Sequence, residues 1–181
     1  MKFLEVDINF SLDYKNGNGA ALSQMLSGVC LINEKGNSIP TLERSDFFIH
    51  LCAHLYKEAT TLPWIRMKRD MTLYKYCDIY MLLSEMSDAD LWKIFSRAHA
   101  LGIEKICSYA ILETMDLFDM VNPFARGLCR GVLENDPDFR LKVTSPEEKK
   151  VLIYQTADAT DRFFSESRLS DLEEVKEDAT T

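Results

Sequence analysis

Hydrophobic positions follow a period of two near the N-terminus and a helical period over most of the remaining chain. Residues 2–11 (KFLEVDINFS) alternate apolar and polar positions, which predicts a strand with one buried and one polar face. Residues 20–26 predict a short helix. Residues 29–33 and 38–42 flank a turn that contains Gly36, so they predict a β-hairpin, and Pro40 makes its second arm an edge strand.

Five helices are predicted after the hairpin. Apolar residues at helical spacing and capping residues give the ranges 43–60, 65–86, 87–101, 103–118 and 123–133. Pro63 separates the first two, Ser87 or Asp88 caps the third, and Pro123 opens the fifth. Residues 43–60 and 65–86 are the central pair, because each adds a few polar groups to a mostly apolar segment.

The C-terminal part gives conflicting signals. Ser145-Pro146-Glu147-Glu148 matches a helix capping box, whereas Val151–Tyr154 favours a strand, so the structure of residues 151–165 stays open. The predicted fold is α+β, with a small, incomplete N-terminal sheet (strand plus β-hairpin) packed on a bundle of about five helices. We divide the chain into a partial sheet region (1–42), a helical domain (43–165) and an acidic, flexible tail (166–181).

Composition narrows the class of protein. Five cysteines stand singly in apolar contexts, which is typical of free thiols in a reducing compartment, and we expect a cytoplasmic protein. No apolar run approaches the ~18 residues that a membrane span needs. The net charge of −8 argues against general nucleic-acid binding, because affinity for phosphate backbones requires a basic surface.

Several polar side chains of the central helix pair are candidates for chemistry. His50 and His54 stand at i and i+4, as in helical zinc sites, and Glu58 or Asp78 would have to be the third ligand. Histidines hydrogen-bonded to partners across the helix pair are the favoured alternative. Asp78 lies in an apolar run, so we expect it to be buried with a partner.

Basic residues gather at the predicted start of the second helix of this pair. Arg66, Lys68 and Arg69, together with Lys75, could converge on a phosphate group within two helical turns. The alternative is an exposed helix start whose cations form salt bridges. On the predicted N-terminal strand, Glu5 and Asp7 share the polar face, where they could share a cation or simply face solvent.

The runs Ile39–Ala59 and Leu73–Leu83 resemble an uncharacterised bacterial nucleotidyltransferase family of the DNA polymerase β-like superfamily. Asp90-Leu91-Trp92 is similar to the family's next segment, and Val6–Phe10 to its preceding strand, with Asn9 where the family commonly has His. The resemblance covers roughly Leu4 to Met120.

The resemblance implies transfer of a nucleoside monophosphate from a nucleoside triphosphate (NTP) to an unknown acceptor. In that superfamily carboxylates hold two Mg²⁺ ions on the triphosphate. The residue that matches the third carboxylate is Asp7, with Glu5 as the fallback, and Asp7 is therefore the expected metal ligand. His54, Lys75 and Asp78 are expected to line the nucleotide or acceptor pocket.

This chain departs from the family pattern because no G-S…D-x-D motif supplies the first two carboxylates. One expectation is therefore a fragment or degenerate form that is not active alone, with the missing half upstream or on another chain. The alternative is a non-catalytic helical interaction module with an exposed apolar surface and a tendency to dimerise.

Overall fold

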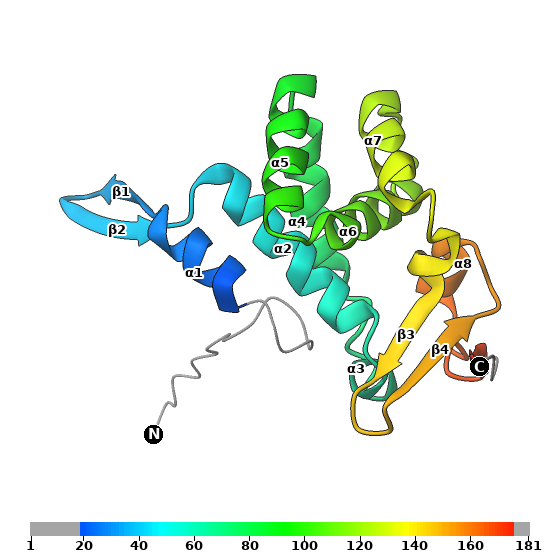
Figure 1. Ribbon diagram of the computed structural model, residues 1–181. Helices are drawn as coiled ribbons and strands as arrows, with labels where there is room; N and C mark the ends of the chain where they lie inside the picture. The colour runs from blue at the N-terminus through cyan, green and yellow to red at the C-terminus, as the bar shows by residue number, and fades with distance from the viewer. Residues whose placement is uncertain (1–18, 176–181) are drawn as a thin grey trace, which may run out of the picture.

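The computed structural model describes residues 19–175 (Figure 1). In chain order the elements are α1 (Gly19–Ser27), β1 (Cys30–Glu34), β2 (Asn37–Thr41), α2 (Arg44–Ala59), α3 (Leu62–Arg66), α4 (Leu73–Ser84), α5 (Asp88–Ala100), α6 (Glu104–Leu117), α7 (Pro123–Leu133), the 3₁₀ helix η1 (Pro137–Leu141), β3 (Lys142–Ser145), β4 (Lys150–Tyr154), α8 (Ala159–Phe164) and β5 (Leu172–Glu174). The α+β class is confirmed, but the sheets differ from the prediction. The predicted strand over residues 2–11 lies outside the described residues.

The helical core is built around α2 and α6. α2 packs against α4, α5 and α6, and α6 also contacts α7 and α8. Every residue from Ile106 to Met115 is buried, so α6 is enclosed on all sides over this stretch. Cys52, Cys107 and Cys129 are buried free thiols in this core, and burial raises the pKa of Cys129 to about 12.

The predicted ends of the later helices are confirmed by their capping contacts. Ser87 caps α5 with a capping box, in which its hydroxyl accepts from the Asp90 backbone N–H and the Asp90 carboxylate accepts from the Ser87 backbone N–H. Gly102 follows α5 with φ +69°, a left-handed conformation that suits glycine. The Asn122 side chain caps α7, with Pro123 at its start.

The predicted hairpin forms, but it does not pack on the helical bundle as the expected sheet would. β1 and β2 pair antiparallel from Cys30–Thr41 to Glu34–Asn37. Every residue of β1 is exposed, including Leu31 at 64% and Ile32 at 54%. In Figure 1 the hairpin projects from one side of the bundle next to α1.

A three-stranded sheet near the C-terminus was not predicted. β3, β4 and β5 pair antiparallel in the order β3-β4-β5. Ser145, the expected helix cap, ends β3, and residues 146–149 form the turn to β4 with Lys149 at φ +53°. The strand preference of Val151–Tyr154 therefore prevails, because Val143 and Tyr154 bury their side chains against Leu62 and Ile65 of α3 in a second hydrophobic core.

The long second helix predicted over residues 65–86 is wrong, because α3 and α4 are separate helices. α3 ends at Arg66, and Lys68 takes a φ of +55°, which stops a right-handed helix. In the intervening loop Asp70 is fully buried and receives a bidentate ion pair from Arg168, with nitrogen–oxygen distances of 2.7 and 2.9 Å. This long-range contact favours a loop over continued helix.

Residues 166–175, which we expected to belong to a flexible tail, make specific contacts. Arg168 binds Asp70, and β5 pairs with β4. Residues 176–181 lie outside the described part of the chain. Among residues 19–175, none of the helices combines the length and the hydrophobicity that a transmembrane span requires.

Candidate functional site

The central helix pair brings together His54, Glu58 and Lys75, which we call the His54–Glu58–Lys75 cluster. His54 and Glu58 stand one turn apart on α2, and Lys75 reaches them from α4. The Glu58 carboxylate accepts from His54 Nε2 at 3.0 Å through Oε1 and from Lys75 Nζ through Oε2. Lys75 Nζ lies 3.4 Å from His54 Nε2, so the three groups form one closed contact.

The ion pair between Lys75 and Glu58 is buried in a region of low dielectric constant, and the cluster reaches solvent through His54. The side chains of Lys75 and Glu58 are 8% and 10% exposed, whereas that of His54 is 28% exposed. Burial alone would raise the pKa of Glu58, but hydrogen bonds from His54 and Lys75 outweigh it and keep that pKa below its usual value. Glu58 is therefore ionised at neutral pH.

The arrangement fixes the imidazole of His54. Because Nε2 donates to an ionised carboxylate, we assign the neutral ring the tautomer in which Nδ1 is the acceptor. A carboxylate that orients a histidine in this way is a general-base pair, and the protonated ring is a hydrogen-bond donor to an anion. His54 also contacts Lys75 across the helix pair at 3.4 Å, but in this tautomer its hydrogen bond is to Glu58 on its own helix, because Nε2–H and the Lys75 ammonium are both donors.

Glu58 is the one residue of the His54–Glu58–Lys75 cluster that we did not predict from the sequence to line the nucleotide or acceptor pocket. The sequence suggested it only as a possible third ligand of a zinc site. Its i, i+4 spacing from His54 on α2 was the signal that could have identified it as a partner of that histidine.

The remaining predicted site residues are not brought to the cluster by any described contact. Asp7 and Glu5 lie outside residues 19–175, so their positions stay predictions. Asp78 stands on α4 three residues after Lys75 and is exposed. The expectation of a buried Asp78 with a partner is wrong, because this position faces out of the bundle and solvent hydrates the carboxylate.

No metal site is formed within the described residues. His50 and His54 lie side by side with ring centroids 6.1 Å apart, but no third His, Cys, Asp or Glu completes a metal-binding group among residues 19–175. The pKa of His50 is lowered by burial and by the charges of His54 and Lys57. A two-Mg²⁺ site does not fit the described residues, and its predicted ligand Asp7 lies outside them.

The prediction that the basic residues at the start of the second helix converge on a phosphate is not supported, because α3 and α4 are separate helices. Arg66, Lys68 and Arg69 are exposed on α3 and the following loop, whereas Lys75 is buried on α4. Arg66 also pairs with Glu148 at 2.9 Å. The four cations do not stand on successive turns of one helix, so their spacing in the sequence does not bring them to a shared anion.

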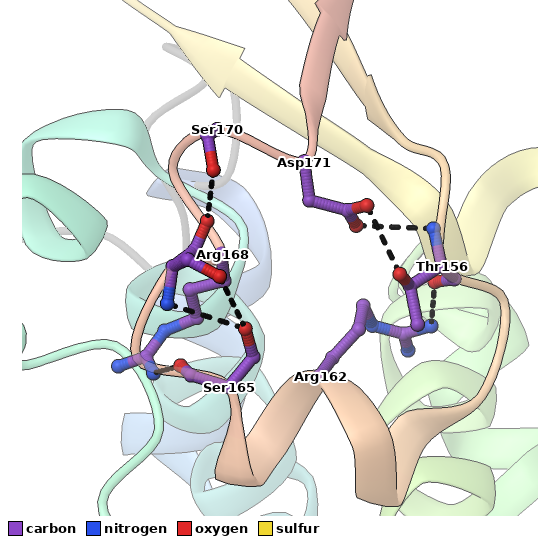
Figure 2. Close-up of a pocket in the computed structure, with 7 residues that line it drawn as sticks. Thr156, Arg162, Ser165, Arg168, Ser170 and Asp171 are labelled. Atoms are coloured by element: carbon purple, nitrogen blue, oxygen red, sulfur yellow. Dashed lines mark hydrogen bonds between the residues drawn. The ribbon is translucent and has the colours of Figure 1, made fainter.

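A polar pocket of about 170 Å³ near the C-terminal sheet is a second candidate, shown in Figure 2. Arg162 and Arg168 line it, together with serines, Thr156 and Asp171. Arg162 binds Glu113 at 2.7 Å and two backbone carbonyls, while Arg168 binds Asp70 and the Ser165 carbonyl. Both cations already have carboxylate partners, so this pocket is structural and is not suited to hold an anion.

Comparison with known proteins gives one informative match. No curated protein and no solved structure matches the chain. The profile of an uncharacterised nucleotidyltransferase family matches residues 1–119, which include both helices of the His54–Glu58–Lys75 cluster and exclude the C-terminal sheet. Since this match covers more than half of the 181 residues, the chain belongs to the uncharacterised nucleotidyltransferase family.

Proposed function

We propose that the protein binds an NTP as part of a nucleotidyltransferase, with His54 at the nucleotide or acceptor pocket, and that transfer of the nucleoside monophosphate needs the two carboxylates that this chain does not supply. The observation that supports this most is that the family match runs through a buried, preorganised cluster that couples a histidine to an ionised carboxylate and a lysine. Such clusters are typical of sites where a proton or an anion is handled.

We assign the members of the cluster different roles. His54 is the most exposed of the three, so it contacts the substrate, either accepting a proton from the acceptor hydroxyl or donating to a phosphate oxygen. Glu58 and Lys75 are positioning residues, because the lysine is buried and its charge is matched by the carboxylate. Asp78, exposed on the same helix as Lys75, is proposed to contact the substrate at the rim.

The predicted metal ligand remains part of this proposal. Asp7, with Glu5 as the fallback, is proposed to hold Mg²⁺ on the strand predicted over residues 2–11. When bound, Mg²⁺ would supply charge stabilisation to the triphosphate. The proposal for His54 can be tested separately from this one.

Equilibrium binding of each of the four common NTPs to the full chain, with and without Mg²⁺, tests the function. We expect His54→Gln to weaken NTP binding by about tenfold, since it removes a charge-assisted hydrogen bond. Asp7→Asn should abolish the dependence on Mg²⁺. His99→Gln is the matched control, because the His99 side chain is 80% exposed on α5, and it should bind like the parent. Absence of binding by the parent chain for all four nucleotides would reject the proposal.

The second candidate function is a non-catalytic module that self-associates through the β1–β2 hairpin. It is favoured by the exposed apolar side chains of the hairpin among the described residues, including Leu31, Ile32 and Ile39 at 51% or more. Light scattering separates the two candidates. Self-association that is lost in Ile32→Lys and unaffected by NTP supports the module, whereas a monomer that binds NTP supports the enzyme.

A further inference from the structure

The hollow between α5, the start of α6 and α7 is a cavity that the proposed function does not use. We call it the α5–α7 pocket. Its volume is about 300 Å³, at the small end of ligand sites in proteins. In Figure 1, α5 and α7 extend to the same side of α6. Side chains from both helices line the pocket. The cluster of His54, Glu58 and Lys75 is on α2 and α4 and does not line it.

The walls of the α5–α7 pocket are apolar and partly aromatic. Trp92 and Phe95 line it from α5, and Leu128 and Val132 from α7. Leu91, Ile94 and Ala98 form the buried face of α5, while Trp92 stands off that face with 61% of its surface exposed. A large indole left at the mouth of an apolar cavity offers a flat surface on which a ring can stack.

The carboxylate of Glu104 in the pocket is only partly paired. Glu104, the first residue of α6, lines the cavity, and its Oε2 atom is buried without a hydrogen-bond partner among the described residues. Its Oε1 atom lies 3.5 Å from Nδ1 of His99, which is 80% exposed at the rim. The neighbouring Lys105 is paired with Asp136 at 2.9 Å. Oε2 itself is closed to solvent, so a ligand reaches this carboxylate through the exposed 28% of the Glu104 side chain, where the negative charge favours a cationic N–H group.

From these features we propose that the α5–α7 pocket binds a small molecule that joins one or two fused aromatic rings to a protonated amine. The rings lie against Trp92 and the apolar walls, and the ammonium group lies at the exposed part of the Glu104 side chain. The cavity volume limits the ligand to this size, and the carboxylate selects a cation over an anion. This site is independent of the proposed NTP site.

A pair of matched probes tests the proposal on the full chain: 2-(1-naphthyl)ethylamine and 1-naphthaleneacetate share a ring and differ in charge. The chain contains two tryptophans, Trp64 and Trp92, so their indole N–H signals in a ¹H–¹⁵N spectrum report the site and an internal control. Trp64→Phe assigns the two signals. We expect the amine to shift the Trp92 signal and leave that of Trp64, and to bind roughly tenfold more tightly than the acid.

Variants link this preference to the carboxylate. Glu104→Gln should reduce the affinity for the amine by about tenfold and remove the preference over the acid. Glu85→Gln changes an exposed carboxylate at the C-terminal end of α4, away from the residues that line the pocket, and should leave both affinities unchanged. The backbone signals in the same spectra show that each variant is folded.

Two results would overturn the proposal. The first is that neither probe moves the Trp92 signal, or that both bind equally well and Glu104→Gln has no effect. The second is that the Trp92 signal moves with protein concentration in the absence of a probe, which would identify the hollow as a contact between copies of the chain.

Discussion

Replacing Glu58 by Gln tests whether the His54–Glu58–Lys75 cluster is the buried ion pair described above. The substitution keeps the shape of the side chain and removes its charge, which leaves the Lys75 ammonium, 8% exposed, without its carboxylate. Removal of one partner from a buried ion pair costs about 3–5 kcal/mol. In a chain of this length each kcal/mol lowers Tm by about 2–4 °C, so Glu58→Gln should lower Tm by roughly 6–20 °C at pH 7.

The stability lost in Glu58→Gln should be largest near neutral pH and smaller at acidic pH. The pKa of Glu58 is lowered in the folded protein, so its pairing stabilises the fold above the ordinary glutamate pKa of about 4.3. That stabilisation is lost as the pH falls through the folded pKa. The difference in free energy of unfolding between the parent and Glu58→Gln should therefore shrink as the pH is lowered from neutral towards about 3.

Thermal and urea unfolding followed by circular dichroism measure both effects. Glu85→Gln is the matched control, because Glu85 forms only a surface pair with Arg44 at 4.0 Å, and we expect a change of about 1 kcal/mol or less. The double variant Glu58→Gln, Lys75→Met should be more stable than Glu58→Gln, since the unpaired buried ammonium is gone. A Glu58→Gln protein that melts with the parent, or a difference that is constant with pH, would refute the buried ion pair.

Three further predictions concern the rest of the fold. Arg162→Met should lower the free energy of unfolding by about 1.5–3 kcal/mol in a urea titration, because it removes a charge-assisted hydrogen bond to buried Glu113, which keeps Arg140 as its other partner. A loss under about 1 kcal/mol would contradict the pairing of Arg162 with Glu113. Gly102→Ala should destabilise the protein by about 1 kcal/mol, because Gly102 has φ +69°. Gly127→Ala within α7 should stabilise it by about 0.5–1 kcal/mol, because there is open space for the added methyl group. Equal effects of the two substitutions in thermal melts would contradict this. Asp78→Asn should change stability by less than about 0.5 kcal/mol because Asp78 is exposed, and a larger loss would place it in a buried pair.

The sequence predicted the elements whose signals are local. The capping box at Ser87, the glycine after α5 and the proline at the start of α7 each define a helix end through contacts within a few residues. The β1–β2 hairpin is defined in the same way by its turn. In each of these places the chain alone specifies the backbone conformation.

The elements that the sequence did not predict depend on partners far along the chain. The break between α3 and α4 contains Asp70, whose partner Arg168 is 98 residues away. The C-terminal sheet forms because Val143 and Tyr154 find an apolar surface on α3, which outweighs the local capping signal at Ser145. The spacing of residues along the sequence does not predict these long-range contacts.

In the candidate site too, some features follow from local spacing and others from long-range packing. The helical spacing placed His54 on the face that meets α4, and Glu58 shares that face. The depth of Lys75 and the exposure of Asp78 depend on how α4 is rotated against α2, which a run of mostly apolar residues does not define.

An NMR titration of the full chain with NTP and Mg²⁺, observing the imidazole signals of its three histidines, tests directly whether His54 contacts the nucleotide. We expect the ring signal of His54 to move in proportion to the bound nucleotide, and that of exposed His99 to stay in place. A nucleotide that binds without moving the His54 signal, or a chain that binds no NTP, would contradict this expectation.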